Sequence, residues 1–348
     1  MLYSFETVDV FTEHRFAGNP LAVFPDARGL SASQMQSLAA ELNLSETAFV
    51  LPPVNPVHSA RVRIFHRTAE MPFAGHPMVG TGFVLARQGL DRNGELLFEI
   101  PAGVVRVEIE RSASGEVMGA VIAAPQPLSL GESISVETIA ACAGLNAEAV
   151  LVARHQPIFA SMGTVYAIAE ITDEALRRAV PNVSEFRRAA DARPHLNGRL
   201  SLLLYVTKEA SKLRARMFAP LAGTYEDPAT GSASTCLAGL LLSLSGESKR
   251  SFDIAQGVEM GRPSSLKVVA AIEHDGIRAT VGGRCVPVLR GTAEVCVLAL
   301  DNWWRRGGSN SRPSHCERDA LPAELRPHEA AKYSDLRLGR KLNGQARD

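Results

Sequence analysis

Glu46 has a sequence context in which a carboxyl group could act as an acid and a base. It lies in the phrase Asn43-Leu44-Ser45-Glu46-Thr47, between the expected end of a helix and the start of an apolar strand. A carboxyl group in such a place can be partly buried, which raises its pKa and lets it accept and return a proton near neutral pH. A solvated loop glutamate is the alternative interpretation.

Two glycine-led helix starts carry further candidate residues. His76 follows Gly75, where free backbone N–H groups and the helix dipole favour a neutral ring that can donate or relay a proton. A packed structural histidine is the alternative. Asp227 comes a few residues before Gly231 and Ser232, and the simplest structural interpretation is an N-terminal cap of that second helix. If the two helix starts face each other, they form a cradle for a carboxylate.

Other sequence features narrow the chemistry. Asn19 lies in Gly18-Asn19-Pro20, where asparagine is also an ordinary turn residue. Neither glycine turn contains a cysteine, and Cys236 lies a full turn inside the second helix, so no nucleophilic thiol or thiol pair is indicated. The five cysteines show no C-x-x-C spacing, and no glycine-rich segment matches a dinucleotide or phosphate loop. We expect no zinc site and no nucleotide cofactor.

A pattern that occurs twice predicts the scaffold of these residues. An arginine-led apolar strand, a short turn and a glycine-led helix span residues 63–85 and again 216–242. Strands outnumber helices and do not alternate strictly with them, which disfavours a doubly wound parallel sheet. We therefore expect an α+β protein with two similar domains, each a curved mixed sheet around one central helix, and a site between them.

The expected boundaries follow from breaks in these patterns. A proline-containing linker begins near Pro125, so we expect an N-terminal domain over residues 1–126 and a C-terminal domain over 127–300. A helix is expected over 31–42 with Ser31 or Ser33 as its N-cap. Three separate strands are expected over 276–281, 284–289 and 291–300. Residues 303–348 are polar and charged, and we expect a disordered tail, which our hypothesis explains as read-through into an adjacent transfer RNA gene.

Composition limits the partners of the chain. It has 348 residues, 46% of them hydrophobic, which is enough to fill two cores. Lys plus Arg and Asp plus Glu both number 37, so no net charge draws the protein to nucleic acid or to an anionic membrane. No signal peptide is indicated, and the longest apolar run is about half of the ~20 residues that a membrane span requires. We expect a cytoplasmic protein with a small-molecule partner.

The phrases described above resemble the phenazine-biosynthesis isomerase-like family, whose fold is similar to that of diaminopimelate epimerase. The resemblance runs from about residue 4 to residue 297 through residues 8–11, 16–24, 43–49, 70–77, 80–81, 215–233 and 256–264. It implies two pseudo-symmetric lobes with a cleft between them, usually in a homodimer, and no metal or organic cofactor. Several ordered motifs in both halves make this resemblance specific.

The resemblance also implies roles for the candidate residues. It implies that Glu46 is the catalytic acid/base and that His76 and Asp227 assist it. Gly75, Gly231 and Ser232 would bind substrate through the helix ends, and Asn19 matches the family's G-N-P phrase near the cleft.

The leading hypothesis is a cofactor-independent isomerase that transfers a proton on a small carboxylate. The related epimerases place a thiol at the start of each central helix, whereas this chain has Gly75-His76 and Gly231-Ser232 there. A single-carboxylate isomerisation therefore fits better, and a cyclic carboxylate such as the phenazine precursor is one candidate substrate. The alternatives are an epimerase of amino or hydroxy acids and a small-molecule binding protein without turnover.

Overall fold

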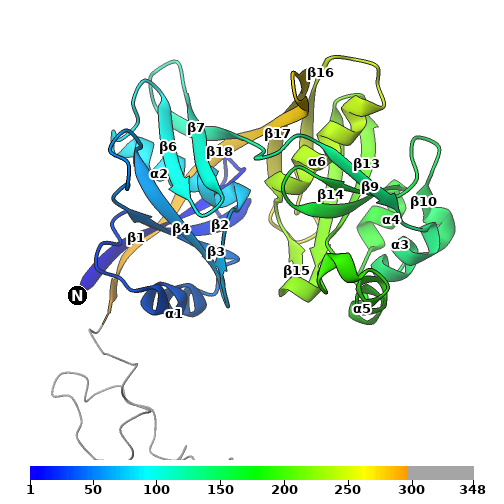
Figure 1. Ribbon diagram of the computed structural model, residues 1–348, viewed down its shortest axis with the longest axis horizontal. Helices are drawn as coiled ribbons and strands as arrows, with labels where there is room; N and C mark the ends of the chain where they lie inside the picture. Colours follow the sequence, from blue (N-terminus) through cyan, green and yellow to red (C-terminus); the bar gives the residue numbers. More distant parts are fainter. Residues whose placement is uncertain (296–348) are drawn as a thin grey trace, which may run out of the picture. The chain divides into compact units, whose positions relative to one another are not determined.

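A computed structural model describes residues 1–295 of the chain. Leu2 to Glu294 form a single compact unit with two lobes of mixed β-sheet (Figure 1). The predicted tail over residues 303–348 lies outside the described residues. In the described part of the chain, every helix is too short or too polar to span a bilayer.

The first lobe is formed by the N-terminal part of the chain. Its elements are β1 (Leu2–Val10), β2 (Asn19–Phe24), α1 (Ala32–Leu42), β3 (Glu46–Leu51), β4 (Ala60–His66), β5 (Glu70–Met71), α2 (Gly75–Arg87), β6 (Glu95–Ile100), β7 (Gly103–Arg111) and β8 (Val117–Ala123). Helix α1 begins as predicted, because the Ser31 hydroxyl accepts from the backbone of Gln34 while the Gln34 side chain accepts from the Ser31 backbone.

The second lobe repeats this plan with an added group of small helices. Its elements are β9 (Ser129–Ser133), α3 (Val136–Ala143), β10 (Val150–Leu151), β11 (Ile158–Ser161), β12 (Val165–Ile171), α4 (Asp173–Arg178), α5 (Val183–Asp191), β13 (Leu202–Glu209), β14 (Lys212–Ala219), β15 (Thr224–Asp227), α6 (Gly231–Ser243), β16 (Lys249–Gln256), β17 (Ser264–Glu273) and β18 (Gly276–Glu294). Helix α5 had no counterpart among the predicted elements.

The two lobes have the same strand pairing, which confirms the predicted pair of similar α+β domains. In the first lobe β2 and β3 are parallel, β3 and β4 antiparallel, and β4 pairs parallel with β6 beyond helix α2. In the second lobe β12, β13, β14 and β16 pair in the same senses around helix α6. The arginine that leads each repeat makes an equivalent contact in both lobes. Arg63 binds Glu70 and Arg216 binds Glu226, each through two hydrogen bonds.

Strand β18 differs from the prediction. It is one strand of 19 residues where three were expected, and it pairs first with β17, then with β8 and finally with β1 (Figure 1). The Gly282-Gly283 pair is not a turn. A Cβ atom at Gly282 would lie 2.5 Å from Val121 Cγ2, and one at Gly283 would lie 2.7 Å from Phe11 Cδ1. The glycines therefore allow close packing within the strand. Strand β18 joins both lobes, and the domain boundary between residues 126 and 127 stays a prediction.

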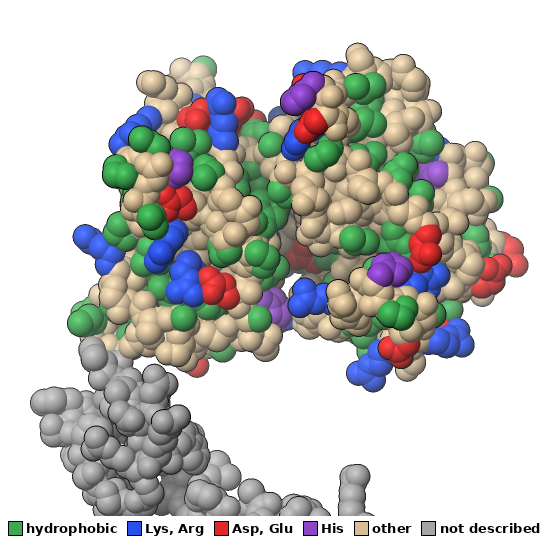
Figure 2. All heavy atoms as spheres, in the orientation of Figure 1, with side chains coloured by type: hydrophobic (Ala, Val, Ile, Leu, Met, Phe, Trp, Pro, Cys, Tyr) green, Lys and Arg blue, Asp and Glu red, His purple; other side chains and the backbone are tan. Residues whose placement is uncertain are grey.

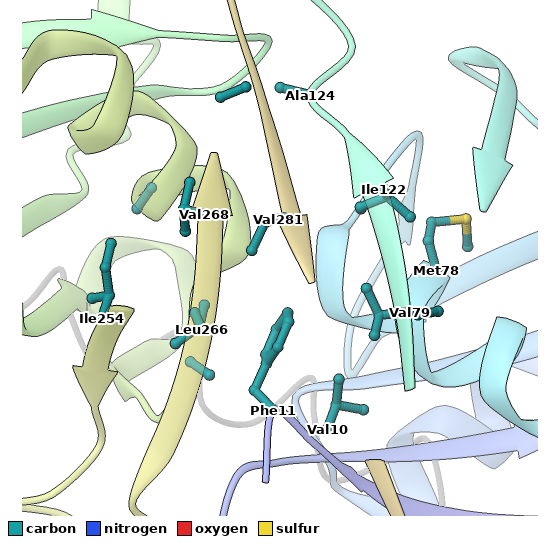
Figure 3. Close-up of a cluster of buried hydrophobic side chains, with 14 of the residues drawn as sticks. Val10, Phe11, Met78, Val79, Ile122, Ala124, Ile254, Leu266, Val268 and Val281 are labelled. Atoms are coloured by element: carbon teal, nitrogen blue, oxygen red, sulfur yellow. The ribbon is translucent and has the colours of Figure 1, made fainter. Parts of the chain in front are cut away.

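A continuous hydrophobic core connects the two lobes. Figure 3 shows Phe11 between side chains of α2 and β8 on one side and of β17 and β18 on the other. Residues 75–86 of helix α2 are all buried, which explains why this helix is apolar on every face. A second, smaller cluster lies under α3 to α5. The central helices and the ends from which they start are thus fixed by packing from both lobes.

Candidate functional site

The N-termini of α2 and α6 face each other where the lobes meet. A Cβ atom on Gly75 would lie 3.8 Å from the backbone nitrogen of Ser232 and 3.9 Å from the Cα atom of Gly231. Neither helix has a side-chain cap, since Ala74 and Thr230 at the N-cap positions make no such hydrogen bond. The first-turn N–H groups are therefore available to an anion, as the predicted carboxylate cradle requires. That Gly75, Gly231 and Ser232 bind substrate stays a prediction.

Glu46 faces His76 inside the protein. Glu46 begins β3, and its Oε2 atom lies 3.4 Å from His76 Nε2. Both atoms are buried, and neither has a hydrogen-bond partner in the described part of the chain. The Glu46 side chain is only 14% exposed, so the interpretation as a solvated loop residue is wrong. The facing pair leaves both groups available for proton transfer.

The buried position sets the protonation states of this pair. Burial raises the pKa of Glu46 to about 8, with a further increase from the charge of Asp227, against opposing effects of a Ser45 hydrogen bond and the Arg67 charge. Burial alone lowers the pKa of His76 to about 3. Near neutral pH, Glu46 therefore exchanges between its two forms while the imidazole is neutral and carries one N–H donor.

Asp227 ends strand β15 and is held by side chains from both lobes. Its Oδ1 atom accepts from Asn19 Nδ2 at 2.9 Å, and its Oδ2 atom accepts from the Thr230 hydroxyl. Burial raises the pKa of Asp227 to about 6, although the hydrogen bonds from Thr230 and Asn19 oppose that shift. The interpretation as a helix cap is wrong, because Asp227 binds the Thr230 side chain and the backbone N–H groups of α6 receive no side-chain cap.

Asn19 connects the two lobes within the site. Its amide nitrogen donates to Asp227 and also to the Ala229 carbonyl, and its Oδ1 atom accepts from the Ser45 hydroxyl at 3.1 Å. The residue is fully buried. Both amide donors are thus used inside the protein, which fits a role in holding Asp227 beside Glu46. That Asn19 binds substrate stays a prediction.

Two residues of the site were absent from the candidates chosen by sequence. The Tyr166 hydroxyl lies 2.6 Å from Ser232 Oγ. Gln256 donates to the Asp227 carbonyl at 2.8 Å and to the Thr230 hydroxyl at 3.0 Å, and it accepts from the Thr230 N–H. Gln256 falls in one of the phrases that carry the family resemblance, which was the available signal. Tyr166 lies in a strand where a tyrosine reads as an ordinary core residue.

The loop after Gln256 fixes both sides of the site. A Cβ atom on Gly257 would lie 2.6 Å from the Pro228 carbonyl oxygen, so only glycine allows the backbone to approach the turn that follows Asp227. Arg262 donates to the carbonyls of Ala17 and Gly18 and to the carboxylate of Asp9. The loop therefore joins the Gly18-Asn19-Pro20 turn of one lobe to the Asp227 turn of the other.

The thiol of Cys236 lies near the site but is buried and weakly reactive. Cys236 lies inside α6, where it is fully buried and its Sγ atom contacts the Thr164 carbonyl oxygen at 3.8 Å. Burial raises the pKa of its thiol to about 12, so it stays protonated and weakly reactive.

A small cavity adjoins the helix ends. It has a volume of about 10 Å³, room for about one water molecule. Gly75 and Ser232 contribute to one wall, and Phe73, Ile122, Met162 and Val281 are among its apolar lining. Figure 2 shows a furrow on the surface where the two lobes meet. The helix ends therefore border a small space with a largely apolar lining.

A solved structure shows the fold of the chain. The PhzF-family phenazine biosynthesis protein of Bacillus anthracis superposes with a TM-score of 0.76 over 85% of this chain and 100% of its own, at 24% identity. The pseudo-symmetric lobes and facing central helices are those of the epimerase-like α+β fold.

Sequence comparison identifies the family. The family described as phenazine biosynthesis-like protein, PhzC-PhzF, matches residues 8–291. An uncharacterized isomerase of Mesorhizobium japonicum is 36% identical over 299 residues, which are 81% of this chain and 96% of its own. The trans-2,3-dihydro-3-hydroxyanthranilate isomerase of Pseudomonas chlororaphis is 33% identical over 297 residues, or 84% and 99% of the two chains. The chain belongs to the phenazine biosynthesis-like protein family and is an isomerase.

Proposed function

We propose that this isomerase moves a proton within a small carboxylate and that Glu46 is the group that carries it. The observation that supports this best is the Glu46–His76 pair, two buried atoms 3.4 Å apart that have no hydrogen-bond partner. A carboxyl group with a pKa of about 8 can both remove and return a proton near neutral pH. One related isomerase acts on a cyclic amino acid, trans-2,3-dihydro-3-hydroxyanthranilate, so a cyclic carboxylate is a first candidate.

One proton is removed and one is returned in this scheme. Ionised Glu46 takes a proton from a substrate carbon, and the electron pair of the broken C–H bond delocalises toward the neighbouring unsaturated carbons. Protonated Glu46 exchanges that proton with solvent and then delivers a proton to a second carbon, which moves the double bond and restores the carboxylate. The neutral His76 ring donates to the charge that develops, and the helix ends bind the substrate carboxylate. Asp227, with its pKa near 6, is the second group able to exchange a proton.

The closest rival is an epimerase that uses two bases on opposite faces of one carbon. Such an enzyme exchanges the Cα hydrogen of an amino or hydroxy acid with solvent and abolishes its optical rotation. The buried, unreactive Cys236 thiol and the single facing carboxyl–imidazole pair favour the isomerase. The second rival, a binding protein, predicts affinity without chemistry.

The test is an NMR screen of small cyclic, amino and hydroxy carboxylates in deuterated water. The wild type should introduce deuterium into one substrate, and the rate should rise with pH toward about 8 as Glu46 ionises. Glu46→Gln should abolish the exchange, whereas the exposed Glu41→Gln on α1 should leave it unchanged. Equal exchange by the wild type and Glu46→Gln would reject Glu46 as the carrier. Loss of rotation at one carbon would favour the epimerase, and binding without exchange would favour the binding protein.

The cellular setting is part of the proposal. We propose that the enzyme works in the cytoplasm as a homodimer, with a small carboxylate as its partner and no role for nucleic acid or membrane. The buried free thiols of Cys142, Cys236 and Cys285 support a reducing compartment, and the balanced charge supports the absence of a nucleic-acid or membrane partner. The family resemblance supports the dimer. Sedimentation of the full chain at several concentrations tests that state directly.

A further inference from the structure

Arg67 lies at a contact between equivalent turns of the two lobes. It belongs to the turn that joins β4 to β5, and its Nη2 atom donates to the carbonyl oxygen of Gly223 in the turn that joins β14 to β15. The neighbouring His66 ring packs there too, because a Cβ atom on Gly223 would lie 3.4 Å from His66 Cε1. These two turns therefore meet where the lobes come together.

The guanidinium group has unused binding capacity. Arg67 is half-buried, and within residues 1–295 it forms no ion pair with a carboxylate. Its contact with Gly223 uses one of five N–H donors. Arg63 and Arg216 differ, because each is already paired with a glutamate through two hydrogen bonds.

The charge of Arg67 reaches the proposed proton carrier. Burial and the charge of Asp227 raise the pKa of Glu46, and Arg67 is the cation that lowers it. Glu46 also pairs across strands β3 and β4 with His66, the residue before Arg67, so the guanidinium lies within electrostatic range of the carboxyl group that faces His76. A cation there can stabilise the negative charge of a bound carboxylate and of the anion formed when a proton is removed from carbon.

A charge balance of the site suggests how many anionic groups it accepts. Each helix N-terminus acts as about half a positive charge, so the ends of α2 and α6 together offset about one negative charge. Asp227 supplies that negative charge above its pKa of about 6. Glu46, with a pKa of about 8, is mostly uncharged at pH 7. The charge of Arg67 remains, which matches one carboxylate on the substrate.

We propose that Arg67 is a substrate-binding residue whose guanidinium supplies the counter-charge of a substrate with a single carboxylate, while the helix ends supply N–H donors. This inference rests on the proposed function of the site and assigns its substrate class. Without substrate, the guanidinium is held by the Gly223 carbonyl. A dicarboxylate would leave the site with an excess negative charge, and a neutral amide would leave Arg67 unpaired.

The test uses three variants. Arg67→Gln removes the charge and keeps a donor for the Gly223 carbonyl, and Arg67→Lys keeps the charge. Arg61→Gln is the control, because Arg61 is exposed near the start of β4, six residues before Arg67 and about 20 Å away along the strand. Calorimetry measures binding of cyclohex-1-ene-1-carboxylate, its neutral carboxamide and cyclohex-1-ene-1,2-dicarboxylate.

We expect the wild type to prefer the monocarboxylate over both other probes. Arg67→Gln should weaken monocarboxylate binding by about 10- to 100-fold and leave amide binding unchanged, because a hydrogen bond to a charged group is lost. Arg67→Lys should recover most of the loss, and Arg61→Gln should behave like the wild type. Equal weakening of acid and amide would indicate a purely structural contact and overturn the proposal. So would tighter binding of the dicarboxylate, or failure of the monocarboxylate to bind.

A titration tests the position of the guanidinium without any ligand. The charged and titratable groups around Glu46 are His76, Asp227, Arg67, Tyr166 and His66, which pairs with Glu46 across strands β3 and β4. With ¹³C-labelled glutamate, NMR should show a higher Glu46 pKa in Arg67→Gln than in the wild type, and an unchanged value would overturn the proposal. Deuterium exchange separates the two claims. Exchange by the wild type with an unchanged KM in Arg67→Gln rejects only the role of Arg67, whereas no exchange by the wild type rejects the proposed function.

Discussion

The side-chain amide of Asn19 donates to Asp227 Oδ1 at 2.9 Å, although 208 positions separate the two residues in the chain. The same nitrogen donates to the Ala229 carbonyl, and the Ser45 hydroxyl donates to Asn19 Oδ1. One buried amide therefore contacts the segment that precedes Glu46 and the turn that carries Asp227. The relative placement of the two carboxyl groups depends on it.

Asn19→Ala should lower both stability and activity. It leaves a carboxylate oxygen, a carbonyl oxygen and the Ser45 hydroxyl without their buried partner, so the free energy of unfolding should fall by about 2–4 kcal/mol. Urea denaturation measures this change, and Asn146→Ala, at an exposed position, is the control. Wild-type stability of Asn19→Ala would show that the connection between the lobes does not depend on this amide.

Glu46→Gln should change how stability depends on pH. Burial raises the pKa of Glu46 from 4.5 to about 8, so the folded protein retains a proton that the unfolded chain releases between these values. The contribution of this proton is complete below pH 4.5 and is lost as the pH rises toward 8. Relative to that of the wild type, the free energy of unfolding of Glu46→Gln should therefore increase by on the order of 2–4 kcal/mol between pH 5 and pH 9. Denaturation at a series of pH values measures this gain; parallel curves for both proteins would contradict it, and Glu41→Gln is the control.

Local signals predicted the elements that carry the site. The capping residues of α1 and the glycine that starts each central helix define the beginnings of these helices. The repeated arginine-led strand indicated two similar lobes before any pairing was known. The fold could be predicted to this level because caps, glycines and apolar patterns act over a few residues.

Long-range packing determined what local patterns could not predict. Gly282 and Gly283 read as a break between strands, yet they lie within β18 because Val121 and Phe11 approach them too closely for a side chain. The contact of Glu46 with His76 depends on how β3 and α2 pack together, which residue spacing does not reveal. The assignment of Glu46 as the leading candidate therefore came from the family resemblance.

Gln256→Met should impair activity by releasing the turn around Asp227. Methionine has a similar size but makes none of the three hydrogen bonds with which Gln256 holds Asp227 and Thr230. We expect proton exchange into the substrate to fall by about 10-fold or more, because a small displacement of a reacting group has a large effect on rate. Kinetics of deuterium exchange test this, with Gln88→Met, at an exposed position after α2, as the control. Wild-type kinetics in Gln256→Met would show that the Asp227 turn is held by other contacts.

Tyr166→Phe should weaken substrate binding through Ser232. The Tyr166 hydroxyl is buried, and burial raises its pKa, so it remains protonated and fixes the Ser232 hydroxyl at the start of α6. Removing it should raise KM by about 5- to 20-fold, in keeping with one hydrogen bond, and change kcat by less than about 3-fold. Ser232→Ala should have a similar effect, and the double variant should be no worse than either single one, since both remove the same interaction. Tyr225→Phe, which removes an exposed tyrosine's bond to the Pro181 carbonyl, is the control. If the losses of the two single variants add up in the double variant, Tyr166 does not act through Ser232.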